Sequence, residues 1–355
     1  MEQGYFHRVH RLSPTRFWVN NPTPSEADLA IAAGAISCTT NPTFAMRLLQ
    51  HEETAADAQA LVDRALANAR QDGSVCESVV TGLCAGLFDR FLPQFEASGG
   101  TRGFVSIQGN PHLDEDAGQI VDEALRYRGS AVNFIAKVPA TQAGIAAMEE
   151  LLKQGVPVVA TEIMGVAQMI ACAEAYRRSV PGGSPGPAFF LTHITGILDE
   201  YFQKVVREKE IAISRDVLWQ AGCAVARRQY RVFKERGYDG IMLGGGARGT
   251  HHFTEMVGSE MHVTINWTGT ADRLIQEDPP VIWRMFTPTP DAVLSELLEK
   301  VPGFRQAYDE AGLAVEEFAR FGPVLHFRDL FVRGWDHLLG VIAARRPIAP
   351  APGKR

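Results

Sequence analysis

Short apolar runs alternate with amphipathic stretches along most of the chain. Eight of these runs are rich in β-branched and aromatic residues, which is typical of strands. They cover residues 16–20, 35–39, 103–108, 132–137, 156–161, 187–192, 239–243 and 261–265. Between them lie helical patterns such as TQAGIAAMEELLKQG, which begins at Thr141 and ends at Gly155. This alternation predicts an α/β fold, a (β/α)8 TIM barrel with additional helices, although a doubly wound sheet alternates in the same way.

Two long helical segments fall outside the alternation. Residues 45–100 are predicted to form a helical insertion, and residues 288–345 add helices after the eighth strand. These last helices either cover the barrel or form an oligomer contact. Residues 347–355 have the composition of a disordered tail. Because no repeat or linker divides the chain, we expect residues 1–355 to form one barrel domain.

Composition narrows the class of protein without naming an activity. The chain has 355 residues, of which 46% are hydrophobic, and a net charge of −6. No basic stripe is visible, so we expect no nucleic-acid partner. The five cysteines are scattered and form no C-x-x-C pair, as in a reduced cytoplasmic protein. No signal peptide is recognisable and no apolar run reaches roughly 18 residues, so no membrane association is expected.

Lys137 lies where lysines are uncommon, at the end of the fourth apolar run in NFIAKVPATQAG. The period of two places Asn133, Ile135 and Lys137 on one side of the strand. If that side faces the barrel interior, burial lowers the pKa of the lysine and leaves an amine that can attack a ketone to form a Schiff base. The alternative is a lysine paired with a carboxylate at the strand end.

Other polar residues stand at the predicted strand ends, where barrel enzymes carry their active sites. They are Asn20, Thr40 and Asn41, Gln108, Thr161, Thr192 and His193, and Arg248. Amides and hydroxyls around one lysine suit a polyhydroxylated substrate, although each could instead be a turn former or a strand cap.

A glycine-rich loop, LGGGARG, follows the seventh run. In a barrel such a loop commonly binds phosphate, for which Gly246 would allow close approach and Arg248 would supply a forked donor. A plain tight turn and a dinucleotide site remain alternatives, the latter weaker because no acidic residue is well placed downstream. His251 and His252 are adjacent, which does not suit metal binding in the usual i, i+4 arrangement, and no metal site is predicted.

Four segments resemble the transaldolase family in order and spacing. They are FWVNNPTPSEADLAIAAGAISCTTNPT, GFVSIQGNPHLDEDAGQIVDEA, NFIAKVPATQAGIAAMEELLKQGVPVVAT and PAFFLTHITGILDEY. The resemblance implies that Lys137 forms the Schiff base, Asn41 holds donor hydroxyls, Thr161 positions a water and Arg248 binds phosphate. It also implies sugar or sugar-phosphate substrates, a homodimer, and no metal or organic cofactor.

The chain departs from the family pattern at five other positions. They are Asn20 and Gln108, where carboxylates are usual, and Val159, Ala188 and His193. Amides cannot transfer protons as carboxylates do. Glu162 is the nearest substitute, although strict alternation points it away from Thr161, and His193 could bind phosphate or titrate. We therefore expect transfer with altered specificity, aldol cleavage without transfer, or a catalytically impaired barrel that binds sugar phosphates.

Overall fold

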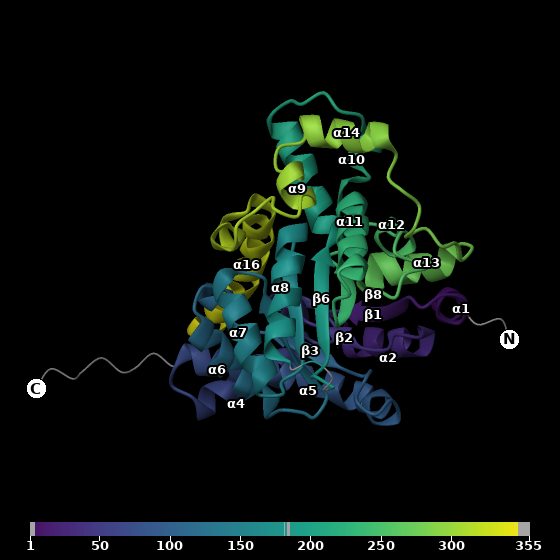
Figure 1. The fold of residues 1–355 in the computed structure, drawn as a ribbon. Helices are drawn as coiled ribbons and strands as arrows, with labels where there is room; N and C mark the ends of the chain where they lie inside the picture. The colour runs from purple at the N-terminus through teal and green to yellow at the C-terminus, as the bar shows by residue number, and fades with distance from the viewer. Residues whose placement is uncertain (1–3, 181, 183–184, 347–355) are drawn as a thin grey trace, which may run out of the picture.

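The computed structural model describes residues 4–180, 182 and 185–346, and its eight parallel strands form a closed barrel surrounded by helices (Figure 1). The strands follow chain order: β1 (Arg16–Asn20), β2 (Cys38–Thr39), β3 (Val105–Gln108), β4 (Phe134–Pro139), β5 (Val158–Ile163), β6 (Phe189–Ile194), β7 (Ile241–Gly245) and β8 (His262–Asn266). Pairing of β1 with both β2 and β8 closes the barrel. This confirms the predicted (β/α)8 TIM barrel and excludes the doubly wound sheet.

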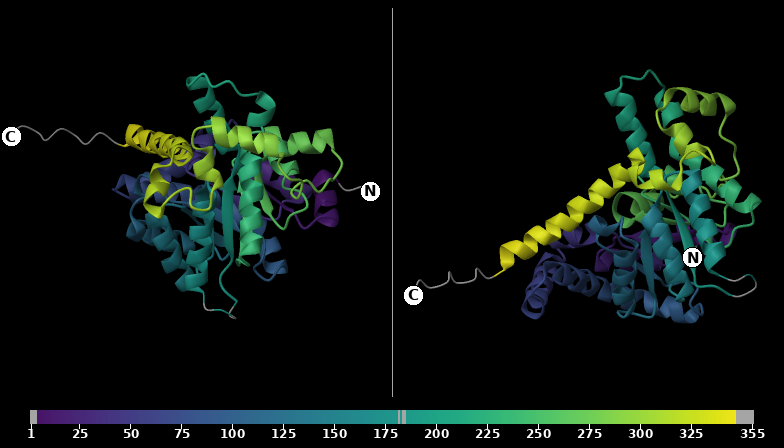
Figure 2. Two further views of the ribbon diagram at one scale, coloured as in Figure 1. Left: turned by 45° about the horizontal axis from the view of Figure 1, so that its top comes forward. Right: turned by 60° about the vertical axis from the view of Figure 1, so that its left-hand side comes forward.

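Helices lie between the strands and beyond the last strand. They are α1 (Tyr5–Leu12), α2 (Pro24–Ala33), α3 (Thr43–Gln50), α4 (Ala55–Asn68), α5 (Asp72–Ala97), α6 (Ala117–Arg128), α7 (Gln142–Lys153), α8 (Val166–Ser179), α9 (Thr195–Glu208), α10 (Arg215–Leu218), α11 (Ala221–Glu235), α12 (His251–Thr254), α13 (Asp272–Glu277), α14 (Asp291–Lys300), α15 (Phe304–Tyr308) and α16 (Gly322–Arg345), with short turns η1 (Pro111–Leu113), η2 (Trp267–Ala271) and η3 (Val315–Arg320). Figure 2 shows α16 as one long helix across the barrel, where it packs on α3, α5 and α9.

The lower half of the barrel interior is filled by side chains. They are Trp18, Ile36, Phe104, Ile135, Val159, Phe190 and Leu243, all buried. The indole nitrogen of Trp18 donates a hydrogen bond of 2.9 Å to His262 Nδ1, which satisfies its polar edge within this layer. Because the interior is closed below, only its upper end, at the carboxyl ends of the strands, is left for a ligand.

Several strands continue further than the sequence predicted. Lys137 and Thr161 were expected to end their strands, but β4 runs on to Pro139 and β5 to Ile163, with Pro139 opposite Thr161 in the ladder. These two predictions ended each strand at the polar residue that follows its apolar run. That is wrong for a barrel in which polar side chains point into the upper interior while the backbone ladder continues.

Two helix boundaries are set by local chemistry. The predicted helix after residue 141 is confirmed, since the Thr141 side chain accepts a hydrogen bond from Gly144 N. Helix α2 begins after Thr23, whose side chain accepts from Glu26 N and forms a capping box with the Glu26 side chain. Among the described residues, no helix has both the length and the apolar character needed to cross a bilayer.

Candidate active site

A cavity of about 370 Å³ opens at the carboxyl ends of the strands. Most of its walls are polar, and two aromatic rings of α16 form part of its rim. The polar side chains that line it are Asn20, Asn21, Thr39, Asn41, Thr43, Arg47, Lys137, Thr192, Arg248, Thr264, Asn266 and Thr268, and the two rings are those of Phe327 and Phe331. The cavity gathers residues from strands on all sides of the barrel, which is the arrangement expected of a barrel enzyme's binding site.

Lys137 lines this cavity and is 8% exposed. Its Nζ donates a hydrogen bond of 3.1 Å to the Thr40 carbonyl and lies 5.8 Å from the centroid of the Phe331 ring. Within the described chain, no carboxylate lies within 4.0 Å of this nitrogen, so the structure does not support the ion-pair alternative. Burial lowers the pKa of Lys137 to about 8, against the opposing charge of Glu162. A useful fraction of the lysine is therefore neutral near physiological pH.

Amide and hydroxyl side chains form a connected wall beside the lysine. Asn20 donates to Asn266 Oδ1 at 2.8 Å and accepts from Thr39 Oγ1 at 2.9 Å. Asn41 Oδ1 accepts from Asn21 Nδ2 at 3.1 Å and from Thr43 Oγ1 at 2.7 Å. These bonds fix the orientation of Asn20 and Asn41, and the side-chain oxygen of each already accepts a hydrogen bond within the protein. They suit a ligand with many hydroxyl groups, which can donate and accept around such a wall.

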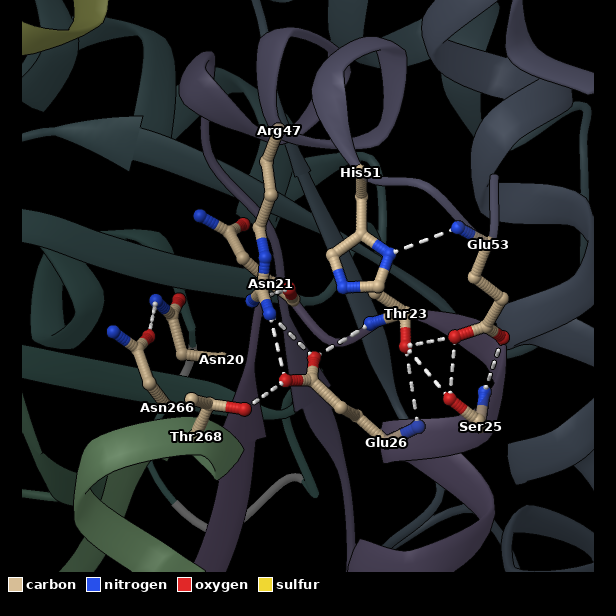
Figure 3. A network of polar contacts seen from close by, with 10 residues as sticks. All are labelled: Asn20, Asn21, Thr23, Ser25, Glu26, Arg47, His51, Glu53, Asn266 and Thr268. Atoms are coloured by element: carbon tan, nitrogen blue, oxygen red, sulfur yellow. Dashed lines mark hydrogen bonds and ion pairs between the residues drawn. The ribbon is translucent and has the colours of Figure 1, made fainter. Parts of the chain in front are cut away.

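A buried ion pair supports the same wall from behind (Figure 3). Arg47 Nη2 lies 2.7 Å from both carboxylate oxygens of Glu26, which is 7% exposed. The Glu26 carboxylate also accepts from Thr23 N at 2.8 Å and from Thr268 Oγ1 at 2.6 Å. A second guanidinium donor of Arg47 reaches the carbonyl of Asn21. Glu26 thus ties α2, α3 and the segment after β8 together at the cavity edge.

Removing this carboxylate should be costly. We expect Glu26→Ala to lower the free energy of unfolding by about 2–4 kcal/mol, since it leaves the half-buried Arg47 without its partner and removes one half of the α2 capping box. Urea unfolding measures the change. Glu52→Ala, at an exposed position nearby, is the matched control and should change stability by less than about 0.5 kcal/mol. Equal effects of the two substitutions would contradict the stabilising role of Glu26.

The glycine-rich loop after β7 also faces the cavity. Gly246 has a φ of +63°, and a Cβ there would lie 2.6 Å from Ile194 Cγ2, so the loop needs glycine. Arg248 is 39% exposed and its Nε donates to Glu200, which also accepts from His326. The predicted phosphate ligand is therefore present at the cavity, but it already has a carboxylate partner.

Two buried hydrogen bonds of His252 hold this loop from outside the cavity. The backbone N–H of Arg248 donates to His252 Nδ1 at 3.0 Å, and His252 Nε2 lies 2.8 Å from Asp199 Oδ2. Asp199, His251 and His252 are the three described side chains close enough to share a metal, with ligand atoms within 4.8 Å of one another. Both nitrogens of His252 are engaged in hydrogen bonds, which supports a positioning role. That the chain uses no metal stays a prediction.

Two predicted substrate ligands lie elsewhere. His193 is fully buried and does not line the cavity, since Nε2 contacts the Gly222 carbonyl at 3.2 Å and Nδ1 contacts Gln229 Nε2 at 3.0 Å. On β6, Thr192 points inward, so its neighbour His193 points out toward the helices. The Thr40 side chain donates to the Ser106 carbonyl at 2.6 Å. The structure therefore does not bring His193 to the cavity, and Thr40 reaches Lys137 only through its carbonyl.

Gln108, Thr161 and Glu162 form a buried group next to Lys137 and outside the cavity lining. Gln108 Nε2 donates to Glu162 Oε1 at 2.9 Å, across the strand that carries Lys137. Strict alternation had directed Glu162 away from this region. It fails because β5 contains a bulge between Ala160 and Ile163.

Arg47 and Asn266 were not recognised from the sequence. Arg47 lies in α3, inside the predicted helical insertion, where nothing distinguishes it from a surface arginine. Asn266 ends β8 one residue past the predicted strand, so the rule that pointed to Asn20 could have found it.

The fold and the site together define a class of protein, the (β/α)8 barrels with a buried lysine in a polar cavity at the carboxyl ends of the strands. The family model described as Transaldolase/Fructose-6-phosphate aldolase matches residues 26–286, and the chain belongs to that family. The resemblance to transaldolases in the sequence is thereby confirmed.

Individual relatives are distant. A transaldolase of Thiobacillus denitrificans is 27% identical over 255 residues, which cover 66% of this chain and 67% of the relative. A transaldolase of Neisseria gonorrhoeae is 30% identical over 172 residues, covering 46% and 48% respectively. A transaldolase of Neisseria meningitidis serogroup A is 40% identical over 91 residues, covering 25% and 26%. These matches span from about a quarter to about two thirds of the relatives' length. The low identity to the longest-matching relative, 27%, makes the chain a divergent member of the family.

Proposed function

We propose that the chain is a transaldolase-like transferase that moves a three-carbon dihydroxyacetone unit from a ketose, or ketose phosphate, to an aldehyde acceptor. The observation that carries this proposal is Lys137, a buried amine without a salt-bridge partner in the described chain, facing a polar cavity. Membership of the family supports the same reaction.

The proposed chemistry begins with the neutral amine of Lys137. It attacks the ketone carbon, and the carbinolamine that forms loses water to give an iminium ion. The iminium accepts the electron pair of the C3–C4 bond as that bond breaks and the C4 hydroxyl loses its proton, so an aldehyde leaves and an enamine stays on the lysine. The enamine carbon then attacks the acceptor aldehyde, and water releases the new ketose. No metal or organic cofactor is required by these steps.

The polar wall would bind the sugar. Asn41 and Asn20 can donate through their amide nitrogens to donor hydroxyls, and Thr192 and Thr264 offer hydroxyls around the lysine. Arg248 would bind a substrate phosphate after exchanging part of its contact with Glu200. Because the two cavity arginines already face carboxylates, we propose a substrate choice that depends less on phosphate than on hydroxyl groups.

A second candidate reaction is aldol cleavage or formation without transfer. The motivation for it is Gln108, an amide that pairs with Lys137 in the strand ladder at a position where the family usually has a carboxylate. Product analysis with and without an acceptor aldehyde separates the two reactions. A homodimer and a cytoplasmic location stay predictions.

Trapping of the imine tests the proposal directly. The protein is incubated with fructose 6-phosphate, and separately with dihydroxyacetone, before borohydride is added and the intact mass is recorded. We expect a covalent adduct that peptide mapping places on Lys137. Absence of an adduct with both ketones, in a folded protein, would contradict the proposal and favour a barrel that only binds sugars.

The role of Arg248 gives a separate prediction. We expect Arg248→Ala to raise KM for fructose 6-phosphate by about 10- to 100-fold, since a charge-assisted hydrogen bond to phosphate is lost. Trapping of dihydroxyacetone, which has no phosphate, should be unchanged. Arg273→Ala, at a surface pair with Glu277, is the control. If trapping of dihydroxyacetone weakens as much as binding of fructose 6-phosphate does, Arg248 does not recognise phosphate.

A further inference from the structure

Strand β5 contains a local irregularity beside the lysine. Ala160 pairs with Leu191 and Ile163 pairs with His193, so Thr161 and Glu162 together lie opposite one residue, Thr192. Glu162 has a φ of +62°, a left-handed conformation that non-glycine residues rarely adopt. Such strained backbone persists where the surrounding structure holds it, and it is concentrated at functional sites.

The bulge turns the Glu162 carboxyl toward Gln108. The side chain is 0% exposed, and its Oε1 accepts the 2.9 Å bond from Gln108 Nε2. Its Oε2 has no partner within the described chain, nor have the neighbouring polar atoms Thr161 Oγ1 and Gln108 Oε1. Buried polar atoms are nearly always hydrogen-bonded, so unpartnered oxygens of this kind mark a place where a reacting hydroxyl or water can be held.

The charges around Glu162 come from three elements. Lys137 faces it from β4, Asp114 from the loop after β3, and Arg328 from α16. Asp114 is itself influenced by Glu115 and Glu123. Burial raises the pKa of Glu162 to about 7, while the bond from Gln108 and the charge of Lys137 oppose the shift. Conversely, the negative charge of Glu162 raises the pKa of Lys137 and partly opposes the lowering caused by burial. The two groups are therefore close enough for the charge of each to shift the pKa of the other.

We propose that Glu162 is the proton-transfer group that serves the Lys137 imine, and that Gln108 holds it in place. The inference rests on the proposed Schiff-base function. Asn20 and Gln108, the polar residues at the ends of β1 and β3, cannot titrate, so a carboxyl near the amine must come from elsewhere.

Each proton transfer balances. The protonated carboxyl gives its proton to the carbinolamine hydroxyl, which leaves as water, and the iminium and the Glu162 carboxylate remain. The carboxylate then removes a proton from the carbon next to the iminium, or from the C4 hydroxyl during cleavage, and an enamine and a protonated Glu162 result. The return of this proton to the enamine carbon reverses the step.

An exchange assay isolates this step without knowledge of the acceptor. Dihydroxyacetone is incubated with the full chain in D₂O, and loss of its carbon-bound hydrogens is followed by NMR while borohydride trapping reports imine on Lys137. We expect Glu162→Gln to slow the exchange by about 10²-fold or more. Glu123→Gln is the matched control, since Glu123 is also a buried glutamate with a raised pKa but lies beside Asn110.

Two further readouts separate proton transfer from packing. The exchange rate of the wild-type protein at saturating ketone should fall as pH drops through about 7, because protonation removes the base. This fall should be absent in Glu162→Gln. The double variant Q108E/E162Q moves the carboxyl to the other end of the same hydrogen bond, and we expect it to recover at least about tenfold of the lost rate.

The outcomes are distinct. An imine on wild-type Lys137 together with unchanged exchange in Glu162→Gln would overturn the role of Glu162 and leave the proposed function intact. Slower exchange without rescue by Q108E/E162Q, and with an unchanged pH profile, would assign Glu162 to packing alone and overturn it as well. No imine on the wild-type protein would overturn the proposed function and this inference with it.

Discussion

Lys137→Met should abolish imine trapping and lower turnover by about 10⁴-fold or more. Methionine keeps most of the side-chain volume but has no amine, so neither the carbinolamine nor the enamine can form. The other polar residues of the cavity, including the proposed sugar ligands Asn41 and Arg248, are unchanged in this variant, and we therefore expect it to retain measurable affinity for the ketose. The measurements are intact mass after borohydride and the initial rate with a phosphorylated donor.

The same substitution should make the protein more stable. The pKa of Lys137 falls from the ordinary lysine value of 10.5 to about 8 because burial penalises the ammonium. A shift of this size corresponds to roughly 3 kcal/mol of cost at neutral pH, which the loss of the 3.1 Å bond to Thr40 partly offsets in the variant. We expect a gain of about 1–3 kcal/mol in the free energy of unfolding.

The pH dependence of this gain has a definite sign. Well below pH 8 the lysine is charged in both states, and the folded protein carries the full desolvation cost. Between about 8 and 10.5 the folded lysine loses its proton while the unfolded one keeps it, so the wild-type protein becomes relatively more stable as pH rises. The advantage of Lys137→Met should therefore be largest at pH 7 and shrink toward pH 10.

A surface lysine provides the control. Lys153 is 53% exposed and 3.9 Å from Glu149, and Lys153→Met should leave trapping, turnover and the pH dependence of stability unchanged. Retention of turnover by Lys137→Met would refute the Schiff-base proposal. A variant that is less stable than the wild type at pH 7 would refute the account of the lowered pKa.

Periodicity predicted the barrel and its lysine because both depend on local pattern. Alternation along β4 follows an undistorted strand, so the direction of Lys137 could be derived from the residues on either side. On β6, the same alternation places the side chains of Thr192 and His193 on opposite sides of the strand. With Thr192 facing the cavity, His193 has to face the helices. The direction of the His193 side chain could therefore be derived from the sequence, and the prediction relied instead on the chemistry of histidine.

Glu162 and Arg47 mark the limit of such reasoning. The bulge in β5 depends on register with β6, a tertiary feature, and one extra residue reverses the direction of every side chain beyond it. Arg47 reaches the cavity only because Glu26 of α2 lies against α3. Neither contact leaves a local signal, since the partners are brought together by packing between elements.

Gly196→Ala is expected to disturb the glycine-rich loop after β7 through a single added methyl group. Gly196 lies in the first turn of α9, and a Cβ there would be 2.5 Å from the Gly246 carbonyl oxygen and 2.6 Å from Arg248 N. Both atoms are backbone, and moving Arg248 N would disturb its hydrogen bond to His252.

We expect this substitution to cost at least about 2 kcal/mol of unfolding free energy, despite the better helix propensity of alanine. It should also raise KM for fructose 6-phosphate as the Arg248 loop shifts, while trapping of dihydroxyacetone on Lys137 continues. Gly340→Ala in α16 is the control, because nothing lies within 4 Å of its Cβ position, and it should instead stabilise by about 0.5–1 kcal/mol. If Gly196→Ala stabilised the protein as Gly340→Ala does, the close approach of α9 to the loop would not exist in solution, and the positioning of Arg248 would need another explanation.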